Sequence, residues 1–464
     1  MSRFFQLLRF RAVLFATLIL AGGLCPSAHA GDFIFGVSGP GIEDSGMLQD
    51  LGWGWARVPL RWSDTTTGGA QDWNAAERQI AAAKGAGMRV QLTISFGWPR
   101  GTQPSFAIDS QTGLPSDDQG RRAMQSFLQE AFNRFGDRMD ALGVEDSLSA
   151  KAFPGGPAVY AQLLKYVSSS ARAVKPGIPI VVGATDFNHM EEDGRIFYVS
   201  DTIRSLGQAG VFDGVELRMR GLNSASDYRR VTGAYEHIAG QLEGTPYENA
   251  RLLLLSNSPA NNESEQAADL VRRSILAAQM GFSAFFWDGG LMDVGNVPTG
   301  LAAGNYKRRV FISGVAVGRM ASKFDLSKTE IVPHGKSLYQ IELTYRTGGT
   351  TTMAWRDYFA EGQSYNSAVN VELKTLEIEG PHRLGLIALP LVAEDGSRLR
   401  GYALPGKDVD IGGAPVLLSQ NVEMLQGLGA EVYKPEPEPE PEPQPAPAQP
   451  QYNAPAARLV PPGR

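Results

Sequence analysis

The feature that most constrains the fold is a regular alternation of short apolar segments with longer helical ones between residues 33 and 321. The short segments are rich in β-branched and other apolar residues, and the long ones repeat their apolar residues at helical spacing. This alternation predicts parallel strands joined by crossover helices. We count about eight such units, which is the number that closes a (β/α)8, or TIM, barrel.

The clearest helix follows the fourth expected strand, where one apolar face runs from Tyr160 to Val174 and Pro176-Gly177 ends it. The eight strands are expected at residues 33–37, 55–59, 89–94, 140–144, 178–183, 214–219, 251–255 and 284–287. We therefore assign residues 31–321 to the barrel.

The pattern changes after residue 321. Short alternating segments at 339–345, 350–355 and 368–373, with turn residues between them, predict a small antiparallel β-sandwich over residues 322–432. Residues 433–464 contain KPEPEPEPEPQPAPAQPQ, which predicts an extended, disordered polyproline II tail that cannot build a core. The tail is either a spacer that reaches a cell-envelope protein or a segment without a specific ligand, and the sequence leaves both open.

Residues 1–30 read as a Sec-type signal peptide. Three arginines precede an apolar run at 12–24, and Ala28-His29-Ala30 forms an A-x-A cleavage site. The run is shorter than the roughly 20 residues of a membrane-spanning helix. We expect a periplasmic or secreted protein without a membrane span after removal of the signal. A lipid anchor on Cys25 is disfavoured because Leu24 precedes it in place of a small residue.

Composition excludes several classes of function. Cys25 is the only cysteine and lies in the signal, so the mature chain has no thiol for disulfides, thiol catalysis or metal binding. Five histidines without an HExxH pair give little support to a metal site, and we expect no metal or cofactor. The net charge of -6, with scattered lysines and arginines, argues against a nucleic-acid partner.

Barrel enzymes carry their working groups at the carboxyl ends of the strands. Tryptophans near these ends would present flat apolar faces with a polar N–H, which suit the faces of sugars, or they would simply cap the core. The candidates near these ends are Arg57, Trp62, Phe96, Trp98, Glu145, Asp186, Trp287 and Asp288.

Several segments between residues 31 and 320 resemble stretches of known glycoside hydrolases of clan A, as their residues show. The opening runs FGVSG, LGWGWARVPLRW and AAKGAGMRVQLTIS are followed by GVEDS and PGGPAVYAQLLKYVSSSARAVKPGIPIVVGA. Together they are most similar to family 39, the family of β-xylosidases and α-iduronidases, and to related glycosidases of exopolysaccharide gene clusters. The resemblance covers most of residues 31–320. It extends to AWRDY and APVLL, which are similar to strands of the family's C-terminal β-sandwich.

Retaining glycosidases use one carboxyl group as acid and base and a second as nucleophile. The resemblance places the acid/base on Glu145, although a glutamate in a surface loop is the alternative. The family asparagine before it is Val144 here, and in RLLLLSNSP the family threonine and nucleophilic glutamate become Ser256 and Asn257. An amide neither attacks the anomeric carbon nor balances its charge, so we expect double displacement to be lost or severely weakened.

The sixth strand departs from the family as well, because FDGVELRMRG replaces a pattern like FDxxxxHxY. Period-two alternation places Glu216, Arg218 and Arg220 on one face. One interpretation is an internal ion pair of Arg218 with Glu145 or Glu216. The other is that the two arginines bind a carboxylate-bearing sugar, and the two interpretations can coexist.

Three functions follow from these observations. The first is a polysaccharide-binding pseudoenzyme of exopolysaccharide export or modification. The second is an active glycosidase or lyase in which Glu145 is the general acid and Asp186, Glu216 or Asp288 is the base. The third is an interaction module that docks through its Pro/Glu tail. Whether the chain is an enzyme stays open at this stage.

Overall fold

The structure, a computed structural model, describes residues 33–39, 41–65, 72–97, 106–109, 114–148, 155–186, 199–207, 210–220, 227–258, 262–293, 299–326, 330–334, 337–356, 368–376, 378, 384–392, 399–404, 408–419 and 430–433. At positions 186, 220, 330, 384–392, 399–404 and 430–433 the description covers the backbone alone. The expected signal peptide, the Pro/Glu tail and Trp98 lie outside the described residues.

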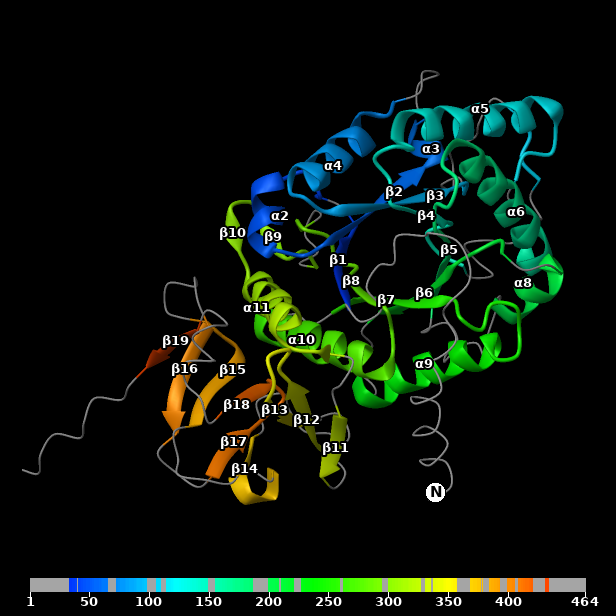
Figure 1. The fold of residues 1–464 in the computed structure, drawn as a ribbon. Coiled ribbons are helices and arrows are strands. Elements are labelled where there is room, and N and C mark those ends of the chain that lie inside the picture. The colour runs from blue at the N-terminus through cyan, green and yellow to red at the C-terminus, as the bar shows by residue number, and fades with distance from the viewer. Residues whose placement is uncertain are drawn as a thin grey trace, which may run out of the picture.

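Eight parallel strands close into a barrel in sequence order, which confirms the expected (β/α)8 architecture (Figure 1). Closure occurs between β1 and β8, where Gly36 is in register with Phe286. A Cβ on Gly36 would lie 2.3 Å from the Phe286 ring, so glycine makes room for that side chain. The strands are β1 (Ile34–Ser38), β2 (Trp55–Arg61), β3 (Arg89–Ser95), β4 (Ala141–Val144), β5 (Ile180–Asp186), β6 (Gly214–Arg220), β7 (Arg251–Asn257) and β8 (Ala284–Trp287).

Helices surround the barrel, as Figure 1 shows. The helix expected after the fourth strand is present as α6, and it ends at Val174 just before Pro176-Gly177. The others are α2 (Ser45–Leu51), α3 (Trp62–Thr65), α4 (Asn74–Gly85), α5 (Asp118–Phe135), α8 (Val199–Leu206), α9 (Asp227–Leu242), α10 (Glu263–Met280) and α11 (Arg309–Lys323), with α6 at Gly156–Val174.

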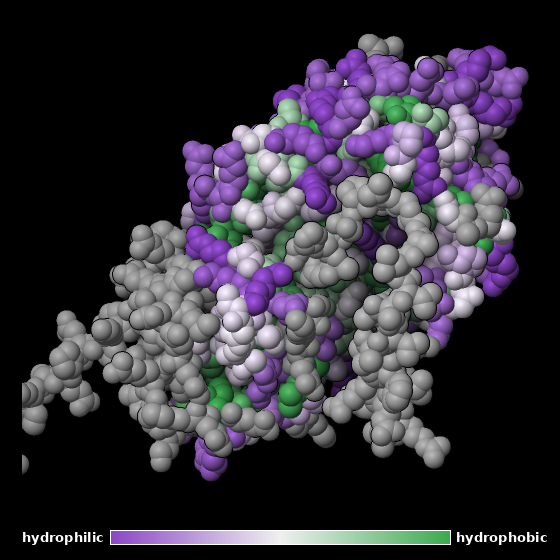
Figure 2. Space-filling model, viewed as in Figure 1, coloured by the Kyte–Doolittle hydropathy of each residue, from purple (hydrophilic) through white to green (hydrophobic). Residues whose placement is uncertain are grey.

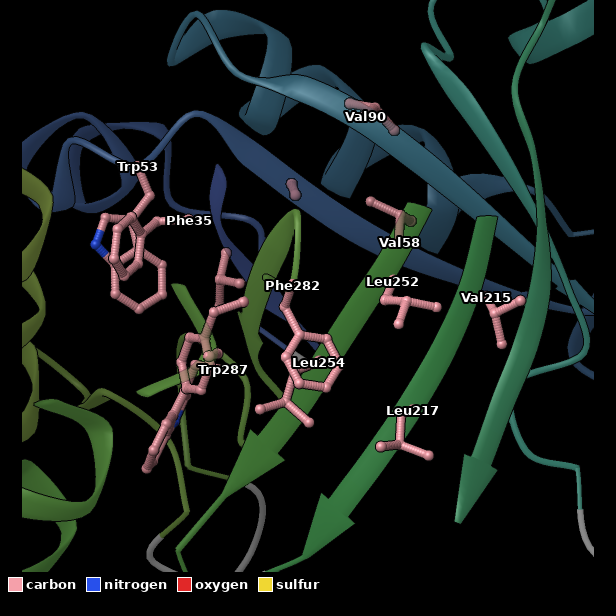
Figure 3. Packing of buried hydrophobic residues seen from close by; sticks show 14 of the residues in the cluster. Phe35, Trp53, Val58, Val90, Val215, Leu217, Leu252, Leu254, Phe282 and Trp287 are labelled. Carbon is pink, nitrogen blue, oxygen red and sulfur yellow. The ribbon is translucent and has the colours of Figure 1, made fainter. Parts of the chain in front are cut away.

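The barrel strands bury apolar side chains on both faces. On β7, Leu253 belongs to a small cluster inside the barrel and Leu254 to the large cluster between barrel and helices, as the period of two requires. Figure 3 shows the large cluster, with Val215 and Leu217 on β6 beside Leu252 and Leu254 on β7. The small inner cluster consists of Val181, Ala184, Leu253, Leu255, Ala284 and Phe286.

The C-terminal part is the expected β-sandwich. A seven-stranded sheet, in the order β11-β12-β13-β18-β15-β16-β19, accompanies the two-stranded sheet β14-β17, and only β16 and β19 pair in parallel among these described strands. Its strands are β11 (Glu330–His334), β12 (Leu338–Thr344), β13 (Thr350–Arg356), β14 (Val369–Glu372), β15 (Leu384–Val392), β16 (Leu399–Leu404), β17 (Asp408–Ile411), β18 (Val416–Ser419) and β19 (Ala430–Tyr433), with a 3-10 turn at Leu373–Leu376.

The sandwich lies beside α10 and α11 in Figure 1. Tyr339 and Trp355 of the sandwich belong to the same apolar cluster as the outer barrel core, and Tyr339 contacts Tyr228 of α9 at 5.0 Å between ring centroids. A short hairpin, β9 (Ala302–Ala303) and β10 (Tyr306–Lys307), connects β8 to α11. Part of the sandwich thus packs into the outer barrel core, while a second, separate apolar cluster lies within the sandwich itself.

The face of the molecule shown in Figure 2 is mostly hydrophilic or neutral where it is described, and its hydrophobic residues occur in small separate areas. No helix among the described residues is long and apolar enough to cross a membrane.

Candidate active site

Glu145 follows β4 directly and has an unusual backbone. Its φ of 71° makes it the only non-glycine residue with positive φ in the described part of the chain. Such a conformation costs about 1–3 kcal/mol and persists only where the surroundings enforce it. The backbone amide of Glu145 donates to the Ile94 carbonyl at 2.8 Å, and its Oε1 accepts from the Phe96 amide at 3.0 Å. The residue is thus fastened to the end of β3 by main chain and side chain.

The Glu145 carboxyl is buried, with 5% of the residue exposed. Burial raises its pKa to about 8, and the negative charge of Asp146 adds to this effect. The Phe96 amide and the Arg61 guanidinium act in the opposite direction but do not outweigh burial. At neutral pH the group is therefore mostly a neutral acid, which is the state that a proton donor needs.

A buried ion pair spans the barrel interior between β2 and β6. The Arg57 guanidinium donates from Nε and Nη2 to the two carboxylate oxygens of Glu216, each at 2.9 Å, and both side chains are almost completely buried. Gln91 of β3 also donates to Glu216. This fork-to-fork geometry satisfies two charges that would otherwise be costly inside the barrel.

Asp146 joins this pair to Arg218. Its carboxylate accepts from Arg57 Nη1 at 2.7 Å and from Arg218 Nη2 at 3.0 Å, and its carbonyl accepts from Arg218 Nη1 at 2.9 Å. Burial opposes the charge, but the two guanidinium groups outweigh it and hold the pKa of Asp146 well below its usual range. Asp146 therefore stays ionised beside the neutral Glu145.

Arg218 also pairs with Asp288 at the end of β8. The distance from Arg218 Nε to Asp288 Oδ2 is 2.7 Å, and Ser38 Oγ donates to the same carboxylate at 3.1 Å. The predicted internal ion pair of Arg218 thus exists, but the predicted partners, Glu145 and Glu216, were wrong. Its partners are Asp146 and Asp288. Nη1 and Nη2 of Arg218 donate to Asp146, whereas its buried Nε lies close to Asp288 without making a hydrogen bond to it.

The residues expected at the nucleophile position lie at the carboxyl end of β7. Arg273 of α10 donates to the Asn257 carbonyl at 2.5 Å and to Ser256 Oγ at 3.3 Å. Arg273 is itself held by Asp227 at 2.8 Å and by Asp269 at 3.2 Å. Buried ion pairs from α9 and α10 therefore fix the end of this strand.

The same two aspartates connect the site to the sandwich. Arg272 lies next to Arg273 and pairs with both Asp227 and Asp269, and it donates to the carbonyl of Gly413 in the sandwich. Two adjacent arginines inside the apolar run ADLVRRSILAAQ were a signal for such a buried network, because charges are rarely buried unless they are paired.

Two tryptophans expected at a sugar-binding rim are buried instead. Trp62 is 1% exposed and stacks between Phe106, at 5.1 Å, and Phe127, at 5.7 Å. Trp287 is 0% exposed, and its indole N–H donates to the Thr299 carbonyl at 3.0 Å. Neither presents a face to solvent, so the alternative interpretation, that they cap the core, describes both.

Two further candidates are described by their backbone alone. Asp186 ends β5 in register with Arg218, and Arg220 ends β6 in register with Asn257. Both positions therefore lie at the same end of the barrel as Glu145.

Sequence reasoning missed Asp146, Gln91 and Ser38. Asp146 follows Glu145 directly in GVEDS, which was the available signal. In the third strand, RVQLTIS, polar residues recur at every second position, and this pattern indicates a polar face turned into the barrel. Among the described residues no group of three or more His, Cys, Asp or Glu is arranged to hold a metal ion.

No protein-family model matches the sequence, and no curated protein matches it significantly. Among solved structures, a family 39 glycoside hydrolase from the gut symbiont Bacteroides cellulosilyticus WH2 has a TM-score of 0.58 at 16% identity, over 84% of this chain and 81% of that one. A glucosidase from Croceicoccus marinus has 0.52 at 13% identity, over 84% and 96%. A GH39 enzyme from Xanthomonas axonopodis pv. citri has 0.50 at 11% identity, over 85% and 99%.

At such low identities the likeness shows the fold, and the chemistry has to be argued from the site itself. The chain, a (β/α)8 barrel followed by a small β-sandwich, has a fold like that of the family 39 glycoside hydrolases.

Proposed function

We propose that this chain is an exported polysaccharide-binding protein that holds its ligand at the carboxyl end of a glycosidase-like barrel and does not cleave it by double displacement. The observation that carries the proposal is the contrast between two strand ends. Glu145 after β4 is buried, strained and protonated, whereas the end of β7 presents the amide of Asn257.

The strain at Glu145 supports a functional role for this end of the barrel. A positive φ on a glutamate has no benefit for folding, and residues in such conformations concentrate at functional sites. A buried neutral carboxyl group is also a hydrogen-bond donor, which suits a sugar hydroxyl or a glycosidic oxygen.

The charged residues around Glu145 support binding over double displacement. Glu216 is completely buried and occupied by Arg57 and Gln91, so it reaches neither water nor an anomeric carbon. Asp288 is paired with Arg218 and Ser38. In a retaining glycosidase the nucleophilic carboxylate lies about 5 to 5.5 Å from the carboxyl group of the acid, and the side chain of Asn257 is an amide without a carboxylate.

The ligand class follows from the fold and from the predicted export signal. The structural neighbours are glycoside hydrolases by name, and a chain with a signal peptide meets polysaccharides of the cell envelope or the exopolysaccharide. Arg218 is buried and already paired with two carboxylates, so a more exposed cation is better placed to meet an acidic sugar. Arg61 has 53% of its side chain exposed and lies 3.8 Å from Asp146, so it is the described candidate. The Pro/Glu tail would then connect the barrel to an envelope protein.

The test is a binding screen of the mature protein against neutral and uronate-containing oligosaccharides, with reducing ends measured in the same samples. We expect saturable binding without new reducing ends. Asn257→Glu restores the missing carboxylate and should keep binding and introduce slow hydrolysis, whereas Asn257→Gln, the matched control, should not hydrolyse. Efficient hydrolysis by the native protein contradicts the proposal.

One observation favours a second function. The pKa of Glu145, raised to about 8, suits a general acid at neutral pH, and an inverting glycosidase needs only a second carboxylate that activates water. Of the three bases considered, Glu216 is buried away from water, which leaves Asp288 and Asp186. If hydrolysis is found, the Asp288→Asn and Asp186→Asn variants are compared, and the variant that abolishes hydrolysis identifies the base.

A further inference from the structure

Tyr160 of α6 makes two hydrogen bonds next to Glu145. Its side chain is completely buried, and its hydroxyl donates to the Val144 carbonyl at 2.7 Å and accepts from the Gly183 amide at 3.0 Å. The first partner is the peptide that precedes Glu145, and the second lies on the neighbouring strand β5. One hydroxyl therefore joins the two strands at the point where Glu145 leaves the barrel ladder.

Gly183 accommodates the unusual backbone of Glu145. A Cβ at position 183 would lie 2.2 Å from the Glu145 carbonyl oxygen and 2.5 Å from that of Val144, far inside van der Waals contact. The pairing of β5 with β6 also shifts register between Val182 and Thr185. Strand β5 thus departs from regular ladder pairing at this point, and the absence of a Cβ on Gly183 leaves room for the Glu145 carbonyl.

The conformation of Glu145 is held from both sides. On the β3 side, Ile94 and Phe96 bind its amide and its carboxyl. On the β5 side, the described contacts to this peptide run through Tyr160 and Gly183. Without the Tyr160 hydroxyl, the buried Val144 carbonyl and the buried Gly183 amide would each lose a hydrogen bond. The positive φ of Glu145 would then lose part of the surrounding structure that enforces it.

We propose that Tyr160 is a positioning residue for Glu145: through the Val144 carbonyl and the Gly183 amide it holds Glu145 in the left-handed conformation that keeps its carboxyl buried against the Phe96 amide. The inference rests on the proposed function in taking Glu145 as the working group of the site. It concerns the geometry of that group and holds whichever saccharide is bound.

The experiment measures the titration of Glu145 in Tyr160→Phe by infrared difference spectroscopy of the carboxyl band, with Glu145→Gln as the reference that identifies the band. The wild-type midpoint is expected at about 8. In Tyr160→Phe the carboxyl gains access to solvent, and burial is the main cause of its raised pKa. We therefore expect the midpoint to fall by at least about one pH unit, the ordinary spread between proteins.

Tyr247→Phe is the matched control. The Tyr247 hydroxyl is also buried and accepts from a backbone amide, that of Val211, at 3.4 Å. This control should leave the Glu145 midpoint unchanged. An unchanged midpoint in Tyr160→Phe, or an equal shift in Tyr247→Phe, overturns the proposal.

A second variant covers the case in which Tyr160→Phe does not fold. Gly183→Ala keeps the hydroxyl but adds a methyl group against the Glu145 carbonyl, and it should lower the midpoint in the same direction. If Gly183→Ala folds with an unchanged midpoint, the proposal fails. Saccharide binding is measured separately on the wild-type protein, so a failure of the proposed function is distinguishable from a failure of this inference.

Discussion

Replacing Glu145 by glutamine should make the protein more stable at high pH. Glutamine has nearly the same shape, its amide oxygen can accept the hydrogen bond from the Phe96 amide, and it never ionises. The wild-type carboxyl has a folded-state pKa of about 8 against an ordinary value of 4.5. Because the folded pKa is raised, this group stabilises the protein fully below pH 4.5, and that contribution is lost as pH rises through 8.

The magnitude follows from linkage. Between the two pKa values the folded state holds a proton that the unfolded state has released, so the free energy of unfolding falls by about 1.4 kcal/mol per pH unit. From pH 5 to pH 8 the advantage of Glu145→Gln over wild type should therefore grow by roughly 3.5 kcal/mol, slightly less than three full units would give, because each titration is only partly complete at the ends of this range. All other titrating groups are shared by the two proteins and cancel in the comparison.

The assay is urea denaturation of both proteins at half-unit steps from pH 5 to pH 9, followed by near-ultraviolet circular dichroism. The quantity of interest is the difference between the two free energies of unfolding at each pH. If that difference stays constant across the pH range within about 0.5 kcal/mol, the two proteins release the same number of protons on unfolding. That result would refute the burial and protonation of Glu145.

Two further predictions concern the barrel interior. Arg57→Met leaves the buried carboxylate of Glu216 without its main partner and should lower the free energy of unfolding by about 3–5 kcal/mol, measured by urea denaturation; a loss below about 1 kcal/mol would show that the pair is not essential. Gly36→Ala places a methyl group 2.3 Å from the Phe286 ring and should lower the free energy of unfolding by about 1–3 kcal/mol in the same urea denaturation. Gly54→Ala is the control, because a Cβ there has nothing within 4 Å, and it should cost less. Equal losses in the two variants would contradict the packing at Gly36.

The barrel was predictable because its signals are local. Apolar runs and helical spacing place each strand and helix without knowledge of its neighbours, and all eight strands lie where the pattern placed them. The predicted ends of the strands were less accurate than their positions. β2 continues to Arg61 and β7 to Asn257, two residues beyond the expected ends, because polar residues at the carboxyl ends still pair in the ladder.

The ion pairs of the site were not predictable in detail. Alternation on β6 correctly placed Glu216 and Arg218 on one face, which the structure shows to be the inner one. Their partners come from other strands, and Arg57 is 159 positions from Glu216 in the chain. A sequence pattern shows which face of the strand a residue occupies. It does not show which of several charged side chains inside the barrel becomes its ion-pair partner. The choice depends on strand tilt and side-chain length in the closed barrel.

The tryptophans illustrate a second limit. Trp62 follows a strand that ends at the functional edge of the barrel, and this position alone suggests exposure. Instead the chain begins α3 at Trp62 and turns the ring against Phe106 and Phe127. Trp287 is covered because its N–H meets the Thr299 carbonyl from the segment after β8. Both outcomes depend on contacts that distant segments supply.

The most direct test of the account is calorimetric titration of the mature protein with oligosaccharides from the cell envelope and the exopolysaccharide, with mass analysis of the same samples after prolonged incubation. The account predicts saturable heat of binding for at least one saccharide, loss of that binding in Glu145→Ala, and recovery of the saccharide uncleaved. Rapid cleavage of the bound saccharide, or binding that does not depend on Glu145, would contradict it.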